Sequence, residues 1–136
     1  YIAGIVAGFN FDFITALPIL MPQVENSIRL IAEELGAVVY KTADDGSVEC
    51  LSFEGVLDLP EVKEAFAEDF IFNLRVHYTS KYGFAMRNNV GHGLEDDGLF
   101  NSYNGLAVWW YTFRLCCQYS FNLRKAIVEK KQGRHS

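Results

Sequence analysis

One short stretch of this sequence holds side chains that could carry out catalysis. Residues 87–93 read Arg-Asn-Asn-Val-Gly-His-Gly. Arg87 is a permanent cation whose planar guanidinium donates paired hydrogen bonds to a phosphate. His92 has an unperturbed pKa near neutrality, so it can accept and return a proton. An arginine and a histidine suffice for phosphodiester chemistry without a metal, because the imidazole moves the proton while the guanidinium stabilises charge on the phosphoryl oxygens.

Helix geometry sets a condition on this chemistry. Residues five apart on a straight helix lie about 140° apart around its axis, so Arg87 and His92 would point to different sides. Glycine reaches backbone angles that other residues avoid, so Gly91 and Gly93 allow the helix to break there. We therefore predict a break that brings the two side chains together. The alternative is a structural polar pair at helix ends, with the two asparagines capping backbone groups.

The elements around this string are predicted to be mainly helical. The first helix covers residues 2–17 and ends near Pro18, because the residue before a proline avoids helix. A second helix opens near Pro22 and ends at Gly36. Residues 61–67, 68–81 and 102–130 are predicted to be helical as well. The last of these carries a wide apolar stripe, which indicates core or dimer interface: Leu106, Trp109, Trp110, Phe113, Cys117 and Phe121.

A change of period between these helices predicts a β-hairpin. Residues 38–40 and 48–53 favour strand, and the pair Asp45-Gly46 between them is a turn signal. A lone hairpin is marginally stable, so we expect it to lean on the helices. The predicted fold is mainly α, a bundle of four to five helices with one small inserted β-hairpin, in a single domain over residues 1–136.

Composition excludes several classes of protein. The 136 residues carry a formal net charge of −5, which excludes a generally basic nucleic-acid coat protein and gives no DNA signal. Cys50, Cys116 and Cys117 cannot all pair, so a disulfide scaffold is excluded and a reducing, cytoplasmic setting is favoured. The cysteines lack the companions that zinc sites need, so we predict no metal and no cofactor. His77 is interpreted as a hydrogen-bonded histidine in the core or at its boundary.

The apolar beginning of the chain raises the question of a membrane segment. Residues 1–21 are strongly apolar but include Asn10, Asp12 and Pro18, so a buried amphipathic helix is favoured over a membrane span. Tyr1 is not an initiator methionine, and no basic stretch of a signal peptide is present. We expect the chain to be the C-terminal part of a longer protein.

The motif string resembles a known family. RNNVGHG matches the RNxxxH signature of the HEPN superfamily (higher eukaryotes and prokaryotes nucleotide-binding domains), and it is especially similar to a branch of uncharacterised proteins with RNxxxHG near the C-terminus. Upstream, Glu25 and Arg29 resemble that branch's Glu-x-x-x-Arg helix. Gly36, a hairpin-like insert and the pair Leu59-Pro60 follow in similar order. The resemblance covers roughly residues 10–125.

The resemblance implies a helical bundle that pairs as a two-fold homodimer. Many of its catalytic relatives are metal-independent RNA endonucleases with the arginine and histidine at the dimer cleft. Carried over by position, Arg87 binds the phosphate, His92 is the general acid and base, and Asn88 positions the substrate. Substrate-binding roles fall to Asn89, Glu25 and Arg29.

Two alternatives stay open at this point. Glu25 and Arg29 are spaced i, i+4, so they could equally form an ordinary surface ion pair. The whole domain could also be a non-catalytic helical module for dimerisation or for binding nucleotides or RNA, in which the motif only shapes an interface.

Overall fold

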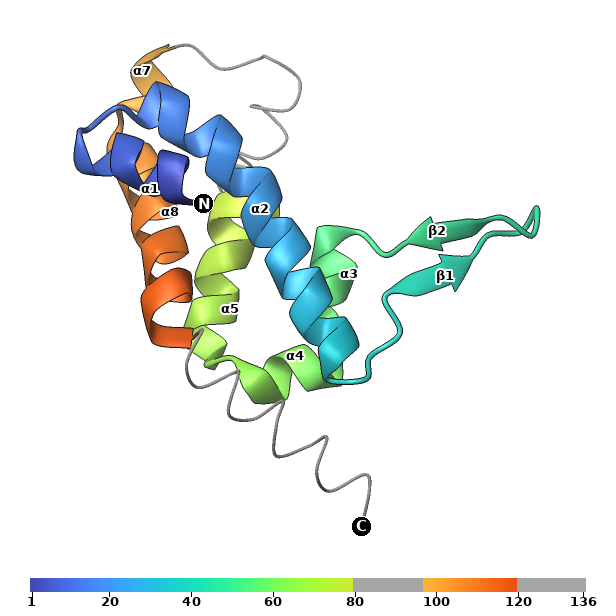
Figure 1. Ribbon diagram of the computed structural model, residues 1–136. Helices are drawn as coiled ribbons and strands as arrows, with labels where there is room; N and C mark the ends of the chain where they lie inside the picture. The colour runs from blue at the N-terminus through green and yellow to red at the C-terminus, as the bar shows by residue number, and fades with distance from the viewer. Residues whose placement is uncertain (80–96, 120–136) are drawn as a thin grey trace.

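The computed structural model describes residues 1–79 and 97–119, and these form a mainly helical protein with one β-hairpin, as predicted. Helix α2 (Phe13–Glu34) is the central element. Helices α1 (Ile2–Phe9) and α8 (Tyr103–Arg114) pack on one side of it, and α3 (Phe53–Asp58), α4 (Pro60–Ala65) and α5 (Glu68–Leu74) complete the frame (Figure 1). A short helix, α7 (Asp97–Phe100), precedes α8.

The predicted boundary between the first two helices is wrong. The chain turns at Phe11, whose φ is 60°, and α2 then runs unbroken through Pro18 and Pro22. The Asp12 side chain caps the new helix by accepting a hydrogen bond from the Thr15 amide at 3.1 Å. Both prolines lie on the exposed face of α2, where water can satisfy the carbonyls that lose their partners. The Asp12 cap and the solvent-facing position of both prolines therefore allow α2 to continue through Pro18 and Pro22.

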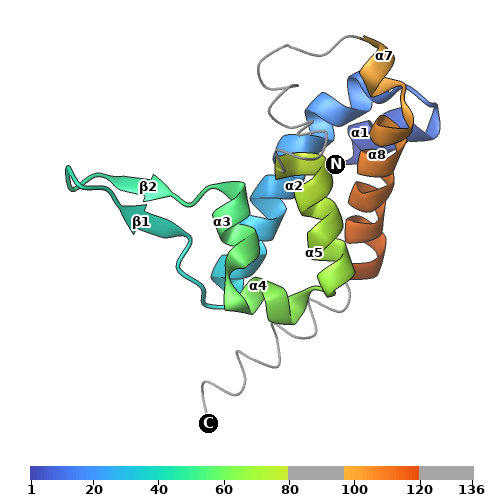
Figure 2. The same cartoon turned by 180° about the vertical axis from the view of Figure 1, so that it is seen from behind.

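The hairpin forms where it was predicted, but it does not lean on the helices. Strands β1 (Tyr40–Thr42) and β2 (Val48–Cys50) pair antiparallel, and Gly46 in the turn has φ 82°. All six strand residues are exposed, and the hairpin projects from the helical body (Figures 1 and 2). Its base is anchored by the buried Val39, whose carbonyl accepts the Leu51 amide at 2.8 Å, and the Tyr40 side chain forms a hydrogen bond with Glu33 on α2.

Two features of the helical frame were not predicted. Helix α3 begins inside the predicted second strand, because the Ser52 side chain caps it by accepting the Gly55 amide at 3.1 Å. Helices α5 and α8 each continue into a π-helical turn, η1 (Arg75–Thr79) and η2 (Leu115–Tyr119). Such turns widen a helix locally and are frequent at functional sites.

Close packing of α1 on α8 depends on a glycine. Gly8 faces the indole of Trp109 with no room for a side chain: an added Cβ would lie 2.5 Å from Cε2 of that ring and closer still to Nε1 and Cδ1. Phe9 meets the Trp109 ring edge-on at a centroid distance of 5.0 Å, and Phe113 stacks on the same indole at 5.7 Å. The predicted apolar stripe thus holds α1 in place through Trp109, which is 6% exposed.

Candidate functional site

The predicted catalytic string lies outside the described residues. Arg87, Asn88, Asn89 and His92 all fall within residues 80–96. The predicted break that would bring the guanidinium and the imidazole together therefore stays a prediction. The described residues form the frame on either side of this segment, which follows η1 and precedes α7.

The other two predicted site residues, Glu25 and Arg29, form a partly buried ion pair on α2. The Arg29 Nη2 atom lies 3.3 Å from Glu25 Oε1, and the two side chains are 14% and 18% exposed. The Arg29 Nη1 atom also donates a hydrogen bond to the Leu51 carbonyl at 2.9 Å. This arginine therefore ties α2 to the segment between the hairpin and α3. A structural role follows directly from these contacts, whereas a role in substrate binding stays a prediction.

The ion pair and the end of η1 converge on the start of α3. The Tyr78 ring, in η1, packs against Phe53 with centroids 5.7 Å apart. Phe53 is the first residue of α3 and lies two residues after Leu51, the acceptor of the Arg29 hydrogen bond. The segment with the predicted catalytic string, residues 80–96, thus begins two residues after Tyr78.

Hydroxyl groups link η1 to α8 and the start of the chain to α2. Tyr78 is fully buried, and its hydroxyl lies 3.2 Å from Thr112 Oγ1 on α8. Burial raises the pKa of the Tyr78 phenol, an effect that the hydrogen bond to Thr112 partly opposes. Tyr1 makes a second link of this kind, since its hydroxyl lies 2.7 Å from Ser27 Oγ on α2. A phenol that stays neutral and sealed is a structural group here, not a proton carrier.

His77 lies at the edge of the core, as predicted, but the expected hydrogen bond is missing at one nitrogen. Its ring packs on Tyr111 with centroids 5.5 Å apart. The Nδ1 atom is buried, and no hydrogen-bond partner for it occurs in the part of the chain that the structure describes. Burial lowers the pKa of His77, which favours the neutral imidazole.

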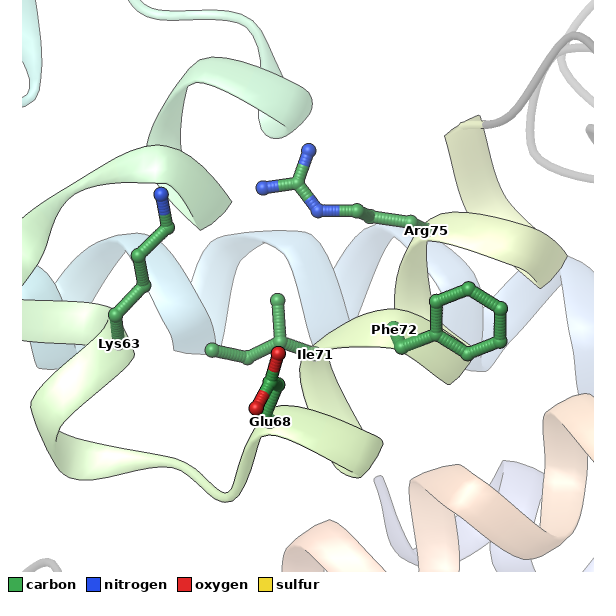
Figure 3. A pocket seen from close by; sticks show the side chains of 5 residues that line it. All are labelled: Lys63, Glu68, Ile71, Phe72 and Arg75. Atoms are coloured by element: carbon green, nitrogen blue, oxygen red, sulfur yellow. The ribbon is translucent and has the colours of Figure 1, made fainter.

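One charged site was missed from the sequence. A pocket of about 480 Å³ lies between α4 and the helix formed by α5 and η1, and Lys63, Glu68, Ile71, Phe72 and Arg75 line it (Figure 3). Its two cations come from different elements, so no spacing in the sequence could have revealed that they meet. Hydrogen bonds from Lys63, which has the larger effect, and from Arg75 lower the pKa of the Asp58 carboxyl beside them.

Neither a metal site nor a membrane-spanning helix is found in residues 1–79 and 97–119. Within these ranges no group of three or more histidine, cysteine or acidic side chains is placed to hold a metal ion. The same ranges contain no helix with both the length and the apolar character needed to cross a membrane.

Comparison with known proteins identifies no family for the chain. No protein-family model, no curated protein and no solved structure matches the chain. The resemblance to HEPN domains thus depends on the sequence motifs alone.

Proposed function

We propose that the chain is a metal-independent RNA endonuclease of HEPN type. The observation that carries the proposal is the string from Arg87 to Gly93, which combines a phosphate-binding cation, a proton carrier and two glycines that permit a break between them. The proposed assembly is a homodimer with the catalytic groups at its cleft. The proposed setting is the cytoplasm, which suits three unpaired cysteines.

The chemistry assigns a role to each side chain of the string. His92 accepts the proton of a ribose 2′-hydroxyl, and the 2′-oxygen attacks the adjacent phosphorus. Arg87 stabilises the negative charge that builds on the phosphoryl oxygens. The bond from phosphorus to the 5′-oxygen breaks, and the imidazolium of His92 gives that oxygen a proton. The products are a 2′,3′-cyclic phosphate and a 5′-hydroxyl, with Asn88 and Asn89 positioning the substrate.

Features of the described frame support this proposal. The π-helical turn η1 directly precedes the segment with the catalytic string, and such turns are common at functional sites. The Glu25–Arg29 pair is held in a fixed orientation by Leu51, close to the end of η1. These contacts at the start of the segment suit a catalytic pair, whose side chains must be held in position.

Cleavage in the presence of EDTA tests the proposal. The wild-type chain should cut RNA with the chelator present, while His92→Ala and Arg87→Ala should each lose at least about 100-fold in rate, a usual cost for losing a general acid–base group and a charge-stabilising donor, respectively. Lys41→Ala is the control, since Lys41 lies on the exposed hairpin and pairs only with Glu49 among described residues. Cleavage that persists in both His92→Ala and Arg87→Ala would refute the proposal.

A second candidate, a non-catalytic dimerisation module, is favoured by an exposed apolar surface on α1 and α8. Ile2, Val6 and Phe9 repeat along α1 and are 83%, 52% and 57% exposed. Trp110, on α8, is 49% exposed and packs against Phe113, which also contacts Phe9. Exposed apolar side chains that gather on neighbouring helices are typical of interaction sites.

The two candidates differ in what they predict for the same variants. A module without catalysis predicts no RNA cleavage, together with loss of the dimer or of stability in Arg87→Ala. Light scattering of the wild type, Arg87→Ala and Val6→Glu measures the dimer directly. Arg87→Ala that stays dimeric but loses cleavage supports the endonuclease, whereas a wild type that dimerises and never cuts RNA supports the module.

A further inference from the structure

The pocket between α4 and α5–η1 combines four kinds of surface in one place. Lys63 on α4 and Arg75 in η1 reach toward each other from opposite sides (Figure 3). Ile71, which is 6% exposed, lies beneath them and gives the pocket an apolar floor. Glu68 adds a carboxylate, and Phe72 adds a ring that is 63% exposed. Small-molecule sites of this volume are usually built from an apolar surface and a few convergent polar groups.

The two cations already hold an anionic oxygen. Lys63 Nζ and Arg75 Nη2 donate to the same atom, Asp58 Oδ1, at 3.0 and 2.9 Å. One oxygen between an ammonium and a guanidinium is in the environment that a phosphate oxygen takes when lysine and arginine bind it together. Asp58 is 58% exposed, and exposed ion pairs contribute little to stability, so a ligand anion can take its place.

We propose that this pocket binds one nucleotide, with its phosphate between Lys63 and Arg75 in place of the Asp58 carboxylate and its base against Phe72. The exposed ring of Phe72 offers a face on which any base can stack. The guanidinium of Arg75 can donate two parallel hydrogen bonds to the phosphate, while Lys63 acts as a point charge. Binding at this pocket does not depend on the cleavage proposed above.

The carboxylates near the pocket set the specificity and limit the affinity. Glu54 Oε1 lies 3.9 Å from Arg75 Nη1 and offsets part of its charge, so we expect affinity in the micromolar to millimolar range. Glu68 only accepts hydrogen bonds when ionised, so it favours a base with amino and ring N–H donors. Guanine has both, and guanosine monophosphate is therefore the probe of choice.

Isothermal titration calorimetry on the full chain tests the proposal. Guanosine monophosphate should bind with one-to-one stoichiometry and more tightly than guanosine or uridine monophosphate. Lys63→Ala should weaken binding about tenfold, the loss of one charge-assisted contact. Phe72→Ala should weaken nucleotide binding about tenfold and leave inorganic phosphate unaffected. Asp58→Asn should strengthen both ligands, because it removes the competing carboxylate.

Controls separate this site from the proposed cleavage. Lys41→Ala removes a lysine of similar exposure to Lys63, 58% against 53%, and should bind like the wild type. His92→Ala should also bind like the wild type, so loss of cleavage and loss of binding are read independently. A 5′-phosphorylated oligoribonucleotide that binds better than its 5′-hydroxyl form identifies the end of a strand as the source of the nucleotide.

Two results would overturn the proposal. The first is the absence of any heat from guanosine monophosphate at millimolar concentration with the wild type and with Asp58→Asn. The second is binding that neither Lys63→Ala nor Phe72→Ala changes. Both side chains are more than half exposed, so these variants are expected to fold normally.

Discussion

Gly8→Ala tests the packing of α1 on α8 most directly. In an isolated helix this change would stabilise, because alanine is favoured over glycine by about 1 kcal/mol. In the folded protein the new methyl group would overlap the indole of Trp109, lying 2.5 Å from Cε2 and closer to Nε1 and Cδ1. The indole cannot simply retreat, because Phe9 and Phe113 pack on it.

The expected net effect is destabilisation. Overpacking a well-filled core costs about 1–3 kcal/mol, and the clash here involves a ring held from two sides. Because the ring is held on two sides, the overpacking cost lies in the upper part of this range, about 2–3 kcal/mol. Subtracting the preference of alanine for helix, about 1 kcal/mol, leaves about 1–2 kcal/mol of lost stability. For a chain of this size, that corresponds to a fall in melting temperature of roughly 3–8 °C. Thermal unfolding followed by circular dichroism measures this shift.

A matched glycine and a double-mutant cycle isolate the cause. An alanine Cβ at Gly55, on α3, would meet no atom closer than Ser52 Oγ at 3.3 Å, a much milder contact than the overlap at Gly8, so Gly55→Ala should destabilise less than Gly8→Ala. In a Trp109→Phe background the overlap is reduced, and Gly8→Ala should then cost less by at least about 0.5 kcal/mol. An increase in melting temperature for Gly8→Ala, or the same cost in both backgrounds, would refute this account of the packing.

Three further predictions concern buried polar groups. Arg29→Gln removes the donor to the Leu51 carbonyl and should cost about 1–3 kcal/mol in chemical denaturation. Thr112→Val leaves the buried Tyr78 hydroxyl without this partner and should cost a similar amount, about 1–3 kcal/mol, in the same assay. The pKa of His77 is lower in the folded chain than in the unfolded chain, so the unfolded chain binds a proton more readily and stability should fall as the pH drops below 6.5. In His77→Phe this fall should be smaller. An identical pH profile of the melting temperature in the variant and the wild type would contradict a buried, neutral His77.

Local patterns in the sequence predicted the helical class and the hairpin because both leave short-range signals. The Asp45-Gly46 turn and the strand-forming residues on either side of it identify a hairpin without knowledge of the rest of the fold. The final helix is confirmed from Tyr103 as far as the described residues extend. By contrast, the end of the first helix was placed at Pro18, since the rule on proline does not take into account which face of a helix meets water.

The sequence by itself determined the candidate catalytic string, because Arg87, His92 and their glycines are adjacent in the chain and their chemistry follows from residue type. Only the tertiary structure decided that Arg29 is bound to the Leu51 carbonyl, and that Lys63 and Arg75 share one oxygen of Asp58. The physical reason is that these contacts join separate elements, whose meeting depends on how the helices cross. Periodicity and capping signals describe one element at a time, so they cannot predict contacts between side chains of different helices.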